Sequence, residues 1–264
     1  MQWASLGEEH QDYILADYVL DVRDEEGEHS LQLVRDTLSG LQKLFPRRKF
    51  RTSWAVTAGW AAQRPPQQAP PMPESLCYAM VVLLFQLDQP GIGLCLLLCF
   101  CGLMRVGEVL NLRLKDMVIG TSEIVVLLAR TKRGEAERVV LASDGVVGLI
   151  KRYVSKFEVK TEQLVCQVPY SRVRAWIPKI AAGLGFQHVP FRSHSFRRGG
   201  ATTLFMSHVP LQTIMHLGRW KSEHSCRMYI HQGEASIIRL KQESGSWPKV
   251  EAIARLVSHL LVDL

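Results

Sequence analysis

A proline-dense stretch limits what this chain can fold into more than any other feature of its sequence. Residues 64–73 read RPPQQAPPMP. Proline lacks a backbone N–H and has a fixed φ, so this segment cannot continue a helix and favours a semi-rigid extended spacer. The stretch therefore predicts a linker at 64–73, between a small region at 1–63 and a larger one from residue 74 onward.

The first region has apolar residues at helical spacing in three segments, 9–23, 29–45 and 49–62. This periodicity predicts three helices and thus a short helical domain. Its start is acidic: residues 1–30 hold nine acidic residues against Arg23 alone, so the remaining chain must carry +15 to give the net charge of +7.

A basic body of this kind indicates a polyanionic partner, because Lys and Arg neutralise phosphates and release their counterions. A basic protein that is merely soluble is the alternative at this point.

The larger region combines helical patterns with one β-hairpin. Segments 74–85 and 91–103 predict buried helices, and 106–112 predicts a short one. Segments 124–129 and 138–142 are rich in Val, Ile and Leu and flank the basic sequence RTKRGE, which predicts a hairpin with a basic tip. Helical patterns resume after Asp144 in four or five segments. The fold class expected is mainly α with a small antiparallel β-sheet, α+β.

Six cysteines lack the paired spacing of a zinc ribbon, and no signal peptide is recognisable, so a reducing, intracellular setting is expected. Cys95, Cys99 and Cys101 lie in the apolar run 94–103 and are interpreted as small buried hydrophobes. No metal site is proposed. The run is shorter than the roughly 20 apolar residues that span a bilayer, so no membrane association is expected.

The most informative polar segment is His194-Ser195-Phe196-Arg197-Arg198-Gly199-Gly200. A helix starting near residue 193 or 195 would place His194 and Arg197 on one face of its first turn, where amides and the helix dipole favour an anion. This predicts a phosphate site, with a solvated helix end as the alternative. The paired glycines predict a close approach of another backbone.

Three further residues are candidates on weaker grounds. Arg105 precedes Glu108 by three positions, directly after a buried helix, and a structural salt bridge between them is the alternative reading. Trp220 is followed nine positions later by Tyr229, although a tyrosine in a helix is usually a core residue.

In this order, the segments resemble the tyrosine recombinases, the phage integrase family, whose catalytic set is Arg, Lys, His-x-x-Arg, His or Trp, and Tyr. Arg105 to Asp116 resembles the first signature box, and Lys132 lies where the family has its β-hairpin lysine. His194 with Arg197 matches the second box, and Leu217-Gly218-Arg219-Trp220 with Tyr229 matches the third. The Trp is a Cre-like variant, and Arg-Arg-Gly-Gly-Ala-Thr and Gly-Arg-Trp resemble recombinases of eukaryotic mobile elements. The resemblance covers about residues 74–235.

The resemblance implies site-specific DNA recombination or integration through a 3′-phosphotyrosyl intermediate on Tyr229, without metal, ATP or any other cofactor. Arg105 and Arg197 would hold the non-bridging phosphate oxygens, and Lys132 would protonate the leaving 5′-oxygen. His194 would hydrogen-bond the phosphate or accept the tyrosine proton. Trp220 would supply an indole N–H, and Glu108 would orient Arg105. Candidate DNA contacts, with plain solvent-facing charges as the alternative, are Arg130, Arg133, Arg198, Arg219, Lys221 and Arg227.

Two departures from the family pattern stand out. Met104 is an extra residue between Gly102-Leu103 and Arg105, which predicts a distorted helix end. The helical region at 1–63 is shorter than the family's usual core-binding domain.

The expected organisation is a core-binding-like region at 1–63, the linker at 64–73, the catalytic domain at 74–248 and a C-terminal helix at 249–264. That helix has an apolar stripe and falls where the family's last helix docks into an adjacent protomer. The expected partners are double-stranded DNA and sister subunits in a homo-tetramer, inside the cell and in the nucleus if the source is a eukaryote. Alternatives are a catalytically inactive or domesticated DNA-binding protein, a type IB topoisomerase and a helical scaffold.

Overall fold

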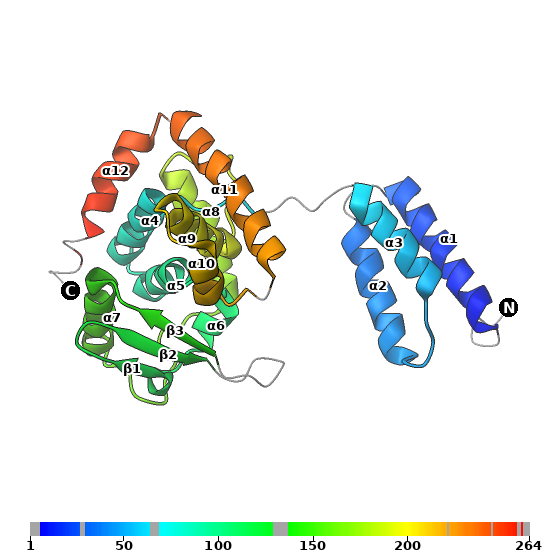
Figure 1. The fold of residues 1–264 in the computed structure, drawn as a ribbon, viewed down its shortest axis with the longest axis horizontal. Helices are drawn as coiled ribbons and strands as arrows, with labels where there is room; N and C mark the ends of the chain where they lie inside the picture. The colour runs from blue at the N-terminus through cyan, green and yellow to red at the C-terminus, as the bar shows by residue number, and fades with distance from the viewer. Residues whose placement is uncertain are drawn as a thin grey trace. The chain divides into compact units, whose positions relative to one another are not determined.

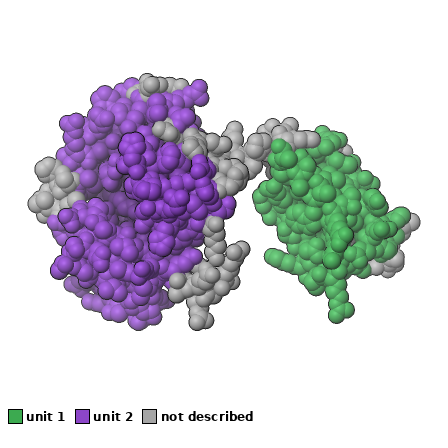
Figure 2. Space-filling model, in the orientation of Figure 1, with its two compact units in different colours: residues 1–68 green, residues 69–264 purple. Residues whose placement is uncertain are grey.

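The computed structural model describes residues 6–26, 30–63, 69–128, 137–220, 222–243, 245–257 and 260. The chain divides into two compact units, Met1–Gln68 and Ala69–Leu264, which Figure 2 shows in green and purple. Each unit has its own apolar core.

The first unit consists of the helices α1 (Glu8–Glu26), α2 (Ser30–Leu44) and α3 (Arg51–Gln63), drawn in blue to cyan in Figure 1. The ends agree within three residues with the helices that the apolar periodicity predicts. The buried side chains that form its core come from all three helices and from the turn before α3; they are Leu15, Val19, Val22, Val34, Leu38, Phe50 and Trp60.

A carboxylate from α1 caps the start of α3. Asp12 is 5% exposed and accepts the backbone N–H groups of Thr52 at 2.7 Å and Ser53 at 2.9 Å. Burial raises the pKa of Asp12, but the hydrogen bonds from Ser53 and Thr52 outweigh it, and the pKa lies below its usual value. A helix start has unpaired N–H donors, so this contact ties α1 and α3 together.

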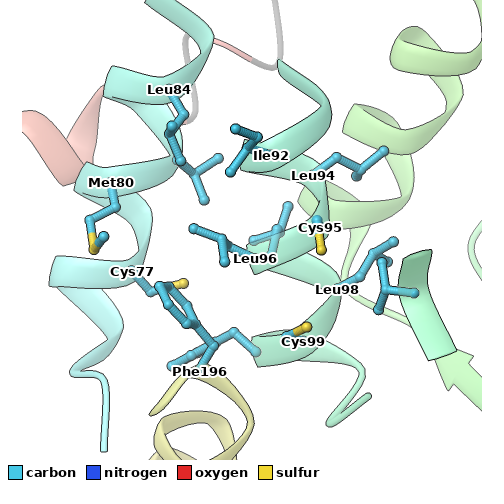
Figure 3. Packing of buried hydrophobic residues seen from close by; sticks show 14 of the residues in the cluster. Cys77, Met80, Leu84, Ile92, Leu94, Cys95, Leu96, Leu98, Cys99 and Phe196 are labelled. Carbon is cyan, nitrogen blue, oxygen red and sulfur yellow. The ribbon is translucent and has the colours of Figure 1, made fainter. Parts of the chain in front are cut away.

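The second unit is built around α5 (Pro90–Cys101), whose residues from Gly91 to Phe100 are all buried. It packs against α4 (Glu74–Gln86), and Figure 3 shows Leu84 of α4 pointing toward Ile92 of α5. A helix that is apolar on every side must be buried on every side. Cys95 and Cys99 are fully buried in this core.

Beside this core lies an antiparallel sheet of β1 (Met117–Ile119), β2 (Ile124–Leu128) and β3 (Glu137–Leu141), in the order β1-β2-β3. The predicted hairpin is confirmed, with Val126 opposite Val139. The strand β1 was not predicted, because three residues are too few to show an alternating pattern. Alternate side chains of the sheet face the core, as the period of two requires.

Six helices follow the sheet in the described part of the chain, against the four or five expected. They are α7 (Asp144–Lys156), α8 (Tyr170–Gly183), α9 (Ser193–Met206), α10 (Leu211–Gly218), α11 (Glu223–Glu243) and α12 (Trp247–Arg255), and the short α6 (Val106–Leu110) precedes the sheet. The extra count comes from short helices such as α10, which ends at Gly218 because Arg219 turns the backbone into the left-handed region.

The last helix differs from the prediction of an apolar stripe at 249–264 that is presented to a neighbour. It begins at Trp247, and Trp247 and Val250 are buried in the core of their own unit, where α12 packs on α4. Farther along, Leu256 is 43% exposed. Residues 258, 259 and 261–264 lie outside the described residues, so docking in trans stays a prediction for the part from 256 onward.

Candidate active site

The helix α9 begins as the sequence predicts, at Ser193, a short distance after Pro190. The hydroxyl of Ser195 accepts the backbone N–H of Arg192 at 3.0 Å, which closes the first turn. His194 is exposed at this end of the helix, whereas Arg197, one turn later, is 2% exposed.

The paired glycines of α9 let this helix lie against two other backbone segments. A Cβ atom on Gly199 would be 2.0 Å from the carbonyl oxygen of Met72, and one on Gly200 would be 2.0 Å from that of Phe100. The predicted close approach is therefore to the end of the proline-rich stretch and to α5. Met72 also donates its backbone N–H to the carbonyl of Ser195 at 2.9 Å.

Arg198 lies on this packed side and not at the surface that we expected for a DNA contact or a solvent-facing charge. It is 3% exposed and donates from Nη1 to the carbonyl of Ala69 at 3.0 Å. The physical reason is that the neighbouring Gly199 has no side chain, so residues 69–72 can pack directly over this side of α9.

Arg105 and Glu108 form a compact unit at the start of α6. One oxygen of Glu108 accepts the backbone N–H of Arg105 at 2.8 Å, and the other accepts Nη1 of the same residue at 2.7 Å. Glu108 thus caps the helix and holds the guanidinium at once. The side chain of Arg105 is 52% exposed and so can reach a ligand.

The extra residue Met104 does not push Arg105 away from the surface. After α5 ends at Cys101, Leu103 takes a left-handed conformation with a φ of 46°, and Met104 turns inward and is fully buried. The predicted distortion is therefore a single left-handed turn.

Arg219 was expected at the surface as a DNA contact, but it is a buried ion-pair partner. Its side chain is 6% exposed; Nη2 lies 2.5 Å from Glu108, and Nε lies 3.0 Å from Glu137. Burial lowers the pKa of Arg219, as does the charge of Arg105, while the two carboxylates raise it. Two carboxylates from α6 and β3 offset the cost of burying this charge.

Trp220 lies between Arg197 and the apolar cluster under α10 and α11. The Cζ atom of Arg197 is 4.8 Å from the centre of the indole ring, and its Nη2 donates to the carbonyl of Gly218 at 2.5 Å. A Cβ on Gly218 would lie 1.8 Å from the Trp220 ring, so only glycine fits there. Trp220 is half-buried and packs against the cluster that includes Leu103 and Ile214.

Tyr229 belongs to α11, which packs along α9: a Cβ on Gly233 would be 2.4 Å from the hydroxyl of Thr202. The side chain of Tyr229 lies outside the described residues, as do Lys132, Arg130, Arg133 and Lys221. Arg227 of the same helix is exposed and pairs with Glu223 at 2.6 Å.

His194 shows that the first and second boxes meet. Its pKa is lowered by desolvation first, and then by the positive charges of Arg197, Arg105 and Arg198. Residues almost 90 positions apart in the sequence therefore act on one imidazole. Two guanidinium groups and a neutral imidazole suit an anion whose charge grows during a reaction.

Glu137 was not among the predicted site residues, and Arg219 was predicted at the surface, whereas its side chain is buried. Both belong to contacts between distant segments, which no periodicity reports. Among the described residues, no cluster of three or more His, Cys, Asp or Glu side chains is arranged to hold a metal ion. In the same part of the chain, every helix is too short or too polar to cross a bilayer.

A model of the phage integrase family matches residues 91–235, more than half of the chain. No curated protein sequence matches this chain. Among solved structures, the XerH site-specific recombinase bound to difH substrate, a pre-cleavage complex, is similar with a TM-score of 0.57 and 15% identity over 86% of this chain and 69% of that one.

A post-cleavage complex of XerH with palindromic difH substrate has a TM-score of 0.58 and 16% identity over 90% of this chain and 70% of that one. The XerA recombinase has a TM-score of 0.52 and 15% identity over 90% and 92%. At these identities the structural likeness shows a shared fold.

Proposed function

This chain belongs to the phage integrase family, the tyrosine recombinases, and on that premise we propose that it cuts and rejoins DNA at specific sites through a covalent bond to Tyr229. One observation carries the proposal. Arg197 of α9 donates to the carbonyl of Gly218, and the next residue, Arg219, pairs with the Glu108 carboxylate that holds Arg105. Two distant segments thus bring their arginines to one place, and α11, which carries Tyr229, packs on α9.

A protein nucleophile conserves the energy of the phosphodiester for the rejoining step. The phenol oxygen of Tyr229 forms a bond to phosphorus as the bond from phosphorus to the 5′-oxygen breaks. The products are a 3′-phosphotyrosyl link and a free 5′-hydroxyl. Rejoining reverses these bonds when a 5′-hydroxyl from the partner strand attacks.

The transition state concentrates negative charge on the non-bridging oxygens, and Arg105 and Arg197 are the residues proposed to bind them. Their surroundings suit different parts of this task. Arg197 is held rigidly by Gly218 and Trp220, whereas the exposed Arg105 is oriented by Glu108 in the first turn of α6. Fixed guanidinium groups here take the place that a metal ion has in other phosphoryl transfer sites.

The remaining roles concern protons. We assign Lys132 to protonation of the leaving 5′-oxygen, because an alkoxide is a poor leaving group. His194 is neutral at pH 7 and is assigned to accept the tyrosine proton or to hydrogen-bond the phosphate. Trp220 supplies an indole donor or an apolar wall against the DNA.

The proposed partner is duplex DNA, and the similarity to XerH solved with difH substrate supports it. Arg227 is exposed and stays a proposed contact to the phosphate backbone, together with Arg130, Arg133 and Lys221. The buried Arg198 and Arg219 are no longer proposed as contacts. A homo-tetramer on two DNA sites is the proposed working form, inside the cell and in the nucleus if the source is a eukaryote.

The domain roles are also proposals. The first unit would serve as a short core-binding-like domain at 1–63, and residues 74–248 as the catalytic domain. Residues 64–73 would link the two, and the end of the chain would dock on a sister subunit.

A covalent adduct is the decisive readout. The protein is incubated in EDTA with a pool of nicked duplexes whose sequence is randomised around the nick, so that a short 5′-hydroxyl fragment is released after cleavage and rejoining is prevented. We expect wild-type protein to form an adduct that survives a denaturing gel, and the trapped DNA gives the preferred site.

Tyr229→Phe removes the nucleophilic oxygen and should form no adduct. The matched control is Tyr170→Phe, which changes an exposed tyrosine at the start of α8 and should form as much adduct as wild type. An adduct with Tyr229→Phe would exclude the nucleophile. DNA binding by wild-type protein with no adduct would favour the non-catalytic DNA-binding alternative.

A further inference from the structure

The backbone at Arg219 has a conformation that favours glycine. Arg219 has a φ of 57° and a ψ of 41°, in the left-handed region. Its N–H donates to the carbonyl of His216, and the N–H of Trp220 donates to that of Met215. This pair of bonds is the Schellman motif that ends many helices, and its left-handed position is usually a glycine because a Cβ is unfavourable there.

The side chain of Arg219 also occupies a costly place. It is 6% exposed and pairs with Glu108 of α6 at 2.5 Å and with Glu137 at the start of β3 at 3.0 Å. Because the backbone of Arg219 ends α10, this one residue connects three elements. Burying a charge is unfavourable even when it is paired, so both backbone and side chain carry a cost at this position.

The contact with Glu108 leads directly to the site. The oxygen of Glu108 that faces Arg219 also accepts the backbone N–H of Arg105, and the second oxygen holds the guanidinium of Arg105. With Arg219 removed, the Glu108 carboxylate would lose its only described cation other than Arg105, and its orientation would be less restricted. The exposed Arg105 has no second carboxylate partner among the described residues to keep its direction.

We propose that Arg219 is a positioning residue for DNA cleavage: braced by Glu137, it holds the Glu108 carboxylate so that Arg105 points at the scissile phosphate. The inference rests on the proposed function, because it requires Arg105 to bind that phosphate. Arg219 itself touches no substrate in this scheme and acts only through Glu108.

A double-mutant cycle tests whether Arg219 acts through Arg105. Single-turnover rates of adduct formation are measured with the preferred nicked duplex for wild type, Arg219→Gly, Arg105→Ala and the double variant. Glycine suits the left-handed backbone, so the change removes the side chain without adding backbone strain. We expect Arg219→Gly to slow the reaction by about 10- to 100-fold, as is usual for residues that orient a site residue.

The double variant should react within about twofold of Arg105→Ala alone, because a residue that acts through Arg105 has nothing left to position. Two defects that multiply would overturn the inference, because a general loss of structure lowers the rate in either background. A wild-type rate for Arg219→Gly would overturn it as well. Absence of an adduct with wild-type protein would instead contradict the proposed function.

Two further variants keep the test decisive if Arg219→Gly is unfolded at the assay temperature, as circular dichroism would reveal. Arg219→Lys keeps the charge but has no planar fork to bind both carboxylates, so it should give an intermediate defect that again disappears in the Arg105→Ala background. Glu162→Gln breaks an exposed ion pair with Lys115 and should leave the rate unchanged.

Discussion

At the scale of single residues, the site contains groups whose surroundings change what they can do. Arg197 is almost completely buried and is held by a carbonyl and an indole ring, while Arg105 is half-exposed and depends on Glu108 for its direction. His194 is exposed, yet desolvation and three nearby guanidinium groups keep its ring neutral. These differences determine which residue changes its protonation with pH and which residues keep a fixed positive charge.

The pH dependence of cleavage should report His194. Its pKa lies below the usual 6.5, so the ring is neutral at pH 7 and takes up a proton only as the pH falls through that lowered value. If the ring accepts the tyrosine proton, the adduct rate at subsaturating DNA stays level down to about pH 6.5 and declines below it. The measurement is a rate profile from pH 5 to 8.

His194→Gln keeps a hydrogen-bonding group that does not titrate, so the decline on the acid side should disappear from its profile. If the same acid decline persisted in the Gln variant, another group would be responsible, and His194 would lose its assignment as the proton acceptor.

At the scale of elements, α9 holds the second unit together. It contacts α4, α5, α8, α10 and α11, and its glycine side meets the backbones of Met72 and Phe100. Its first turn carries His194, and Arg197 follows one turn on. A helix packed so tightly can place these side chains with little freedom, which a catalytic site requires.

Gly199→Ala should destabilise the second unit although alanine is the better helix former. The new Cβ would meet backbone atoms at 2.0 to 2.8 Å, and a backbone cannot move aside as a flexible side chain does. We expect a loss of about 2 to 3 kcal/mol in the free energy of unfolding, measured by chemical denaturation.

Gly148→Ala in α7 is the matched control, because its Cβ would meet only the flexible end of Arg152 at 3.4 Å. The helix propensity then dominates, and we expect a gain of up to about 1 kcal/mol. Equal effects of the two changes would mean that the packing of α9 against Met72 is not tight.

At the scale of the whole molecule, two units with separate cores share one chain. The core of the first unit is small, whereas that of the second extends from Met72 to Val250. The stretch from Ala69 onward belongs structurally to the second unit: Ala69 and Met72 both bind α9, and Met72 is fully buried. The second unit therefore begins before its first helix.

Two truncations test this boundary. A fragment of residues 69–264 should unfold cooperatively with a Tm close to that of the second unit in the full chain. A fragment of residues 74–264 loses the buried Met72 side chain and the hydrogen bond from the backbone N–H of Met72 to Ser195. This loss should lower the free energy of unfolding by about 3 kcal/mol.

For a unit of this size the loss corresponds to a Tm lower by about 6 to 12 °C, which scanning calorimetry can measure. Equal midpoints for the two fragments would show that residues 69–73 contribute nothing to the fold.

Local sequence patterns and ordered motifs were sufficient to predict most of the helices, the hairpin and the family. Periodic patterns report local structure, so α1 to α5 and the β2–β3 pair were predicted within a few residues, and the ordered motifs pointed to Arg105, His194, Arg197, Trp220 and Tyr229. A short element such as β1 escaped because a pattern needs several repeats to be recognised.

Which charges are buried could not be predicted from the sequence, because it depends on long-range packing. Arg198 and Arg219 were expected at the surface, yet one is covered by the chain at Ala69 and the other is enclosed by Glu108 and Glu137. Burial depends on which distant segments pack together, and no local pattern encodes that. The same long-range packing brings the charge of Arg105 to His194, because guanidinium and imidazole interact through space and not along the chain.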